Sequence, residues 1–268
     1  MATLPETTAL DLERDAGWLT VWFNEPDIRN PLSDARVKAL LAMCEAIRND
    51  RTVRGVTFRG RGGIFCAGGD LKLFKSAFEG KLDRDAIIAM SLEAGTLFDA
   101  INTLPQLTVM AIEGAAMAGG LGLACAGDLV VAEQSAKFAF SETTIGLTPA
   151  QISPFVLQRV GLREGRRLML LAESLSADQA MEIGLVDRIC AGTADLDAAI
   201  MAVQKQLTRC APGAVADTKA LILAIPQLSR AEQMRLAAEN FADRFASEEA
   251  RDGIAGFFEK RKPRWAEE

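Results

Sequence analysis

The sequence predicts an α/β protein, with a β/α core over residues 1–195 and a helical region over residues 196–268. Two short segments rich in β-branched and aromatic residues, 18–24 and 53–59, flank residues 33–49, whose apolar residues recur at helical spacing. Two glycine-rich turns each follow a predicted strand and precede a predicted helix. Strand signals stop near residue 195, where three amphipathic helices follow. Strand–helix–strand order favours a βαβ unit.

The individual elements follow from local signals. Ser33 can cap the helix over 33–49, and Asp34 suits its first turn. Ser176 and Ser229 each precede a Gln or Glu by three residues, which is the capping-box pattern, and Gly184 fits a position just after a helix end. Further helices are expected at 85–104 and, after the second glycine-rich turn, up to about residue 126. Further strands are expected at 107–113, 129–132 and 137–140.

Composition limits the range of functions. The chain has 268 residues, a net charge of −6 and a pI of about 5.0, which argues against nucleic acid or an anionic membrane as a partner. No apolar stretch reaches the ~18 residues of a membrane span, and the first residues do not resemble a secretory signal. Five cysteines are scattered singly, as in reduced intracellular proteins. We therefore expect a cytoplasmic protein.

The sequence contains no His and no Tyr. This excludes Ser-His-Asp and Cys-His nucleophilic machinery, metal sites that use His, and dehydrogenase chemistry that depends on Tyr. Proton transfer must then come from Asp, Glu, Lys or Cys.

The two glycine-rich turns span residues 65–71 and 114–122. A turn between a strand and a helix presents unpaired backbone N–H groups, and glycine lets a ligand approach them closely. Two converging turns could place two N–H donors on one oxygen, which would form an oxyanion hole. Tight packing of strand against helix is the alternative explanation for either turn alone.

Three motifs in this order resemble the crotonase, or enoyl-CoA hydratase/isomerase, superfamily: FCAGGDL at 65–71, AGGLGLA at 118–124, and FxxSETTIG at 138–146. The ending EKRKPRW at 259–265 adds to the resemblance. The resemblance implies a crotonase-like spiral of ββα turns with a C-terminal α-helical trimerisation region. It also implies an acyl-CoA thioester ligand, a homotrimer or a hexamer of two trimers, and no metal or cofactor beyond the coenzyme A of the substrate.

Site residues are carried over by their positions in these motifs. Gly69 and Gly119 match the two oxyanion-hole amides, and Glu142 matches the glutamate that exchanges a proton at the acyl α-carbon. Other motif positions are assigned to substrate or CoA binding: Ala67, Gly68, Asp70, Leu71, Lys72, Gly120, Phe241 and Lys260. Asp70 also has a purely structural interpretation, as a carboxylate that caps a strand or helix end.

Hydratases of this superfamily usually carry a second glutamate, which here falls on Gly122. The resemblance therefore leaves three functions open: an enoyl-CoA hydratase, a Δ3,Δ2-enoyl-CoA isomerase that uses Glu142 alone, and a catalytically silent acyl-CoA-binding homologue. Residues 119–125, 147–154 and 210–213 are similar to hydratases of 3-branched glutaconyl-CoA thioesters, namely isohexenylglutaconyl-CoA and methylglutaconyl-CoA. This similarity favours the hydratase. A distal carboxylate would need a cation, for which Lys72, Lys75 and Arg84 are candidates by location.

Overall fold

The computed structural model describes residues 3–266, and for residues 71–74 it describes the backbone only. The strands are β1 (Leu10–Asp15), β2 (Trp18–Phe23), β3 (Gly55–Gly60), β4 (Leu107–Ile112), β5 (Ala115–Met117), β6 (Leu129–Glu133), β7 (Lys137–Ala139), β8 (Leu175–Ser176) and β9 (Arg188–Cys190). The α-helices are α1 (Asp34–Arg48), α2 (Leu71–Phe78), α3 (Arg84–Asn102), α4 (Gly119–Ala126), α5 (Ser153–Leu171), α6 (Ala177–Glu182), α7 (Thr193–Leu207), α8 (Pro212–Ala224), α9 (Arg230–Phe245) and α10 (Glu248–Glu259).

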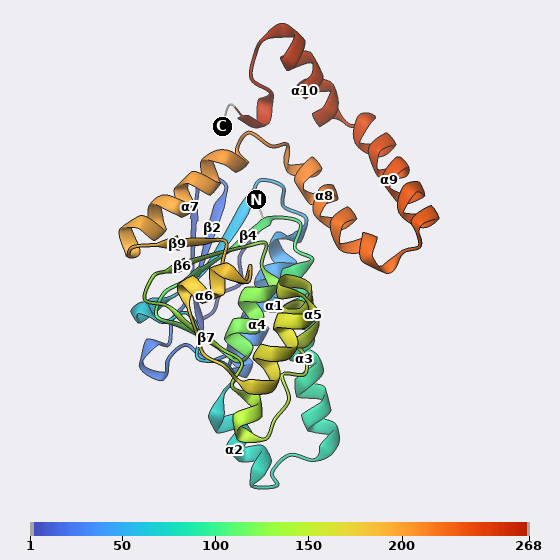
Figure 1. Ribbon diagram of the computed structural model, residues 1–268. Coiled ribbons are helices and arrows are strands. Elements are labelled where there is room, and N and C mark those ends of the chain that lie inside the picture. The colour runs from blue at the N-terminus through green and yellow to red at the C-terminus, as the bar shows by residue number, and fades with distance from the viewer. Residues whose placement is uncertain (1–2, 267–268) are drawn as a thin grey trace.

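A six-stranded sheet in the order β1-β2-β3-β4-β6-β9 forms the centre of the fold. Only the β1–β2 pair is antiparallel, and every later pair in this sheet is parallel. Helices α1, α3, α4 and α5 lie together on one side of the sheet and α7 lies on the other (Figure 1). Strands β3 and β4 are buried, as expected for a parallel sheet covered by helices, although one face of β3 carries Thr57 and Arg59.

A second, three-stranded sheet in the order β5-β7-β8 extends the fold beside the first. The sequence did not predict β5, β8 or β9, because segments of two or three residues are too short to show alternation. The antiparallel strand β1 was missed as well, since its residues are mostly polar. The predicted strands near 18, 53, 107, 129 and 137 are confirmed within one or two residues.

The predicted helix signals are confirmed where the structure tests them. The Ser33 side chain accepts a hydrogen bond from the Arg36 N–H at the start of α1. Both capping boxes form, at Ser176 in α6 and at Ser229 in α9. Gly184 follows the end of α6 with a φ of +75°, a conformation that favours glycine.

Four α-helices, rather than three, follow residue 192. Helix α7 packs on the six-stranded sheet through Leu196, Ala199 and Ile200, all buried. Helix α8 contacts the core through Val215 and Lys219, whereas α9 and α10 extend away from it (Figure 1). The chain then returns so that its end lies near the junction of α7 and α8 (Figure 1). The Trp265 indole N–H donates to the Arg209 carbonyl and fixes this return.

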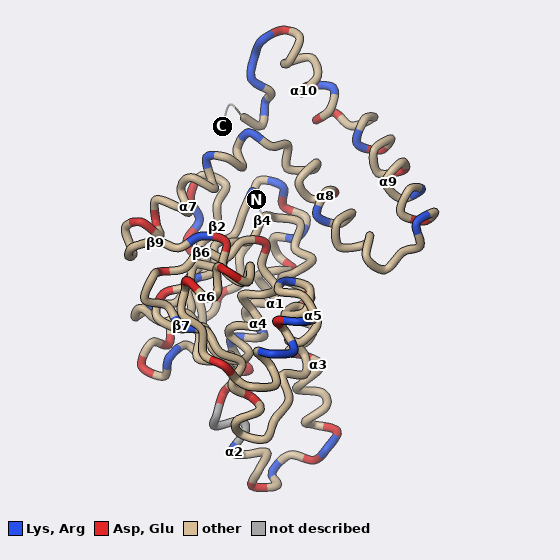
Figure 2. Tube along the Cα trace, viewed as in Figure 1, with Lys and Arg blue, Asp and Glu red and all other residues tan. Residues whose placement is uncertain are grey.

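Charge is distributed unevenly over these helices. Figure 2 shows no charged residue along α4, whereas basic (Arg) and acidic (Asp, Glu) residues are interspersed along α9. This agrees with the burial of α4 in the core and the exposure of α9. Over residues 3–266, the helices are all too short or too polar to cross a membrane.

Candidate active site

The two glycine-rich turns lie side by side because short parallel pairings join them. The Cys66 N–H donates to the Ala115 carbonyl at 3.1 Å, and the Met117 N–H donates to the Cys66 carbonyl at 3.0 Å. On the other side, the Leu32 N–H donates to the Gly68 carbonyl at 2.8 Å. Residues 66–69 are therefore held between the start of α1 and strand β5.

The amides of Gly69 and Gly119 face a common space. A Cβ placed on Gly119 would lie 3.9 Å from the Gly69 nitrogen. In the described part of the chain, neither the Gly69 N–H nor the Gly119 N–H has a hydrogen-bond acceptor. Gly119 is the first residue of α4, so its N–H belongs to the unpaired first turn of a helix, where negative charge is favoured.

Backbone strain marks the same turn. Ala118, which precedes α4, has φ 47° and ψ −123°, a region that non-glycine residues rarely adopt. Such a conformation costs on the order of 1–3 kcal/mol and persists where surrounding contacts hold it. The Ala118 N–H donates to the Ala139 carbonyl at 2.8 Å, which fixes the turn against β7. Strain of this kind is typical of functional sites.

Glu142 lies three residues after the end of β7 and opens a short 3-10 helix, Glu142–Ile145. The bond between Ala118 and Ala139 thus brings the glutamate to the same pocket as the Gly119 amide. Burial raises the pKa of the Glu142 carboxyl above its ordinary value, although a backbone hydrogen bond at Glu142 itself partly opposes the rise. Its Oε2 atom is buried and has no hydrogen-bond partner in the described residues. An unpaired buried carboxylate oxygen is costly unless a ligand or a proton satisfies it.

The space beside Gly122 is filled by Ile152. A Cβ placed on Gly122 would lie 2.1 Å from Ile152 Cγ2 and 2.5 Å from Ile152 Cβ. Ile152 itself is buried, at the residue that precedes α5. An apolar side chain therefore lies where a side chain at position 122 would project.

A pocket of about 540 Å³ holds these groups together. Ala67, Gly69, Asp70, Gly119 and Glu142 all line it. Its far wall comes from α3, mainly through apolar side chains including Met90, Ala94, Leu97 and Phe98. Within α3, this lining extends from Ile87 to Phe98.

Gly68 and Gly120 lie behind the pocket rather than in its lining. A Cβ on Gly120 would lie 2.7 Å from the Cys66 carbonyl oxygen, and Gly68 has a φ of +102°. Both positions need glycine for packing or conformation, which is sufficient reason for their place in the motifs. Their assignment to substrate binding stays a prediction.

Phe241 and Lys260 lie elsewhere in the same chain. Phe241 is exposed on α9 and Lys260 is exposed after α10. Residues of α2 and α3 line the pocket, and these helices lie at the other end of the molecule (Figure 1). The backbone of Leu71 and Lys72 begins α2, but their side chains lie outside the described residues. The other candidate cations, Lys75 and Arg84, are exposed and do not line the pocket.

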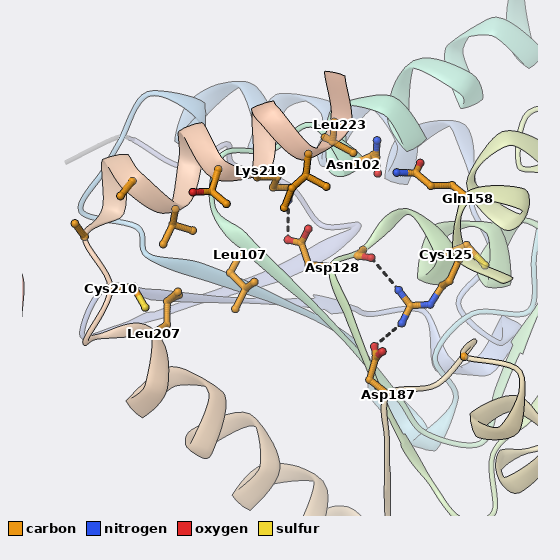
Figure 3. Close-up of a pocket in the computed structure, with 18 residues that line it drawn as sticks. Asn102, Leu107, Cys125, Asp128, Gln158, Asp187, Leu207, Cys210, Lys219 and Leu223 are labelled. Carbon is orange, nitrogen blue, oxygen red and sulfur yellow. Dashed lines mark hydrogen bonds and ion pairs between the residues drawn. The ribbon is translucent and has the colours of Figure 1, made fainter. Parts of the chain in front are cut away.

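A second pocket, of about 830 Å³, lies between α8 and the core (Figure 3). Lys219 on α8 forms an ion pair with Asp128 at 2.7 Å, and Arg159 on α5 forms one with Asp187. The Asp128 carboxylate also accepts hydrogen bonds from the Thr108 N–H and hydroxyl. The charges that line this pocket are therefore already satisfied by one another, and we assign it a structural role.

Two cysteines in or next to the glycine-rich motifs are unsuited to thiol chemistry. Cys66 and Cys125 are buried, and burial raises the pKa of the Cys66 thiol to about 11 and that of Cys125 to about 12. A thiol that stays protonated at neutral pH is a poor nucleophile.

The model of the enoyl-CoA hydratase/isomerase family matches residues 13–268. The chain therefore belongs to that family. It is 33% identical to the human enoyl-CoA hydratase domain-containing protein 2, mitochondrial, over 94% of this chain and 86% of that protein.

Solved structures give the same result. An enoyl-CoA hydratase/isomerase from Marinobacter aquaeolei superposes with a TM-score of 0.92 at 37% identity, covering 96% of this chain and 99% of that one. AtuE from Pseudomonas aeruginosa superposes with a TM-score of 0.93 at 40% identity, with the same coverage. The α/β crotonase fold predicted from the motifs is confirmed.

Proposed function

We propose that this chain is an enoyl-CoA hydratase that stabilises a thioester enolate with the Gly69 and Gly119 amides and protonates it with Glu142. The observation that carries the proposal is the buried, unpartnered Glu142 Oε2 atom, in one pocket with two backbone N–H groups that have no acceptor in the described chain. No cofactor is required beyond the CoA of the substrate.

The chemistry follows from these groups. Two N–H donors aimed at the thioester oxygen stabilise the negative charge that develops there as water adds to the β-carbon. Burial favours the protonated form of Glu142, which donates its proton to the α-carbon. The proton that the attacking water loses restores the Glu142 carboxyl, so that one water is added overall.

The substrate proposed is a 3-branched glutaconyl-type thioester. The support comes from the sequence similarity at residues 119–125, 147–154 and 210–213, and from the apolar Ile152 beside Gly122. A β-carbon with two carbon substituents tolerates partial positive charge, so water adds with less help from a base. The substrate's own carboxylate would take the role of the missing second glutamate: it would orient that water, or take its proton and pass it on to the Glu142 carboxylate.

The contact between Gly122 and Ile152 also favours a second candidate function. With no second carboxylate, Glu142 alone could move a proton between carbons of the enolate, which is a Δ3,Δ2-enoyl-CoA isomerisation. A silent acyl-CoA-binding homologue is the third candidate, and the retained Glu142 and both turns argue against it. A trimeric or hexameric assembly and a cytoplasmic location remain proposals from the sequence.

One assay separates the three candidates. The protein is incubated with conjugated and non-conjugated enoyl-CoAs, and the absorbance of the conjugated thioester is followed together with product mass. Loss of absorbance with a gain of one water supports the hydratase. A gain in absorbance at constant mass would identify an isomerase, and CoA binding without any change would identify a silent homologue.

A further inference from the structure

A polar pair interrupts the apolar wall of the active-site pocket. The Gln151 Nε2 atom donates to the Ser91 hydroxyl at 3.1 Å and joins α3 to the segment that precedes α5. Both residues line the pocket that contains Glu142. Gln151 immediately precedes Ile152, so its backbone is fixed by the packing of Ile152 beside Gly122.

Gly95 provides the space for the Gln151 amide. A Cβ placed on Gly95 would lie 2.4 Å from Gln151 Oε1 and 2.9 Å from Gln151 Cδ. Ser91 and Gly95 are one turn apart on α3, so they share a face of the helix. Glycine inside a helix costs about 1 kcal/mol relative to alanine, and here it permits this close approach.

The pair leaves two hydrogen-bond donors for a ligand. Gln151 uses one Nε2–H on Ser91, and its second Nε2–H has no acceptor in the described part of the chain. The Ser91 hydroxyl accepts that bond, and its own hydrogen is likewise without an acceptor there. Two donors in the lining of the pocket suit a ligand oxygen that only accepts hydrogen bonds.

The charged residues that line the described part of the pocket are all acidic, so an acceptor oxygen of a ligand depends on neutral donors. Asp34, Asp70, Glu93 and Glu142 line it, and the described part of the lining contains no Lys or Arg. Asp34 is paired with Lys38 at 2.9 Å. An acceptor oxygen of the acyl chain must therefore meet neutral donors in the described lining, and Gln151 and Ser91 supply them on the α3 side, apart from the hydroxyls of Ser141 and Thr148.

We propose that Gln151 and Ser91, with Gly95 making room for the amide, select acyl-CoA thioesters whose acyl chain carries an acceptor oxygen beyond the β-carbon. A carboxylate and an ester carbonyl share this chemistry. The inference rests on the proposed function only in taking this pocket as the acyl site.

Binding of saturated thioesters tests the inference without any catalytic step. Three ligands are compared by calorimetry: 3-methylglutaryl-CoA, its methyl ester at the distal carboxyl, and isovaleryl-CoA, which lacks the acceptor. The wild-type protein should bind isovaleryl-CoA about tenfold more weakly than the carboxylate or the ester, because this ligand leaves the two partly buried donors without an acceptor. Tighter binding of the carboxylate alone would identify the charged group as the ligand. Equal binding of all three would overturn the proposal.

Three variants assign the selectivity to the pair. Gln151→Met keeps the length of the side chain but removes its donors, and Ser91→Ala removes the hydroxyl. Gly95→Ala improves helix propensity and displaces the amide, so it should lose selectivity while retaining or gaining thermal stability. Thr96→Val, an exposed hydroxyl deletion on the same helix, is the control and should keep full selectivity.

Different results would contradict the selectivity of the Gln151–Ser91 pair and the proposed hydratase function. Full selectivity in Gln151→Met would overturn the role of the pair, whatever the enzyme catalyses. Loss of selectivity in that variant, combined with no hydration by the wild-type protein, would support the pair and contradict the hydratase.

Discussion

The Ile152 side chain fills the space beside Gly122 so closely that a Cβ at position 122 would lie 2.1 Å from Ile152 Cγ2. The two positions therefore depend on each other. A carboxylate at position 122 is incompatible with Ile152 as it is placed, so the absence of the second glutamate is part of the packing of α4 against the start of α5.

This contact predicts strong coupling between the two residues. Gly122→Ala should lower the free energy of unfolding by about 1–3 kcal/mol, because the added methyl group overpacks a buried site. In an Ile152→Gly background the same change should cost at least about 1 kcal/mol less. Urea denaturation of the four proteins measures the cycle. Additive effects would show that the contact is not rigid.

Stability should respond to pH through Glu142. Its folded-state pKa lies above the ordinary value of 4.5, so between these two pKa values the folded protein holds a proton that the unfolded chain has lost. Stability therefore falls as pH rises through this window. Glu142→Gln should be more stable than the wild type at neutral pH, and the advantage should shrink as pH is lowered toward 4.5. Thermal unfolding of both proteins across this range measures it. An advantage that grows on acidification would contradict the burial of an unpaired carboxyl.

The direction of the reaction should set its pH dependence. Hydration uses protonated Glu142, so its kcat should fall as pH rises through the raised pKa of that group. Dehydration of the 3-hydroxyacyl-CoA uses the ionised form, so its kcat should rise over the same interval. Initial rates in both directions test this pairing. Parallel profiles in the two directions would assign the pH dependence to another group.

Lys219 should stabilise the attachment of α8 to the core. Its side chain is 12% exposed and its ion pair with Asp128 spans 2.7 Å. Lys219→Met should lower the free energy of unfolding by about 1–3 kcal/mol, less than for a fully buried pair, because it leaves the Asp128 carboxylate without its cation. Asp128→Asn in the same protein should recover part of this loss. Denaturant midpoints of the single and double variants supply the comparison.

The sequence predicted the parts of the fold that rest on local chemistry. Ser33, Ser176 and Ser229 cap helices because their hydroxyls meet backbone N–H groups within three residues, which spacing alone reveals. Strands β5, β8 and β9 depend on partners far away in the chain, and two or three residues carry no periodic signal.

The candidate site likewise has residues that the sequence predicted and contacts that only the structure shows. Gly69, Gly119 and Glu142 belong to contiguous motifs, so the sequence could propose them as site residues, and the structure brings them to one pocket. The contacts of Ile152 with Gly122 and of Gln151 with Ser91 and Gly95 join α4, α3 and the segment before α5. No single segment contains such a contact, which is why only the folded chain shows it.

The hydration rate of Glu142→Gln tests the central proposal most directly. The amide keeps the shape of the side chain but cannot protonate the α-carbon, so we expect kcat to fall by about 10²- to 10⁴-fold. Binding of a saturated acyl-CoA should be retained, which separates lost chemistry from lost affinity. The enzyme is assayed with 3-methylglutaconyl-CoA, by thioester absorbance and product mass together. Near-normal hydration by this variant would contradict the role proposed for Glu142.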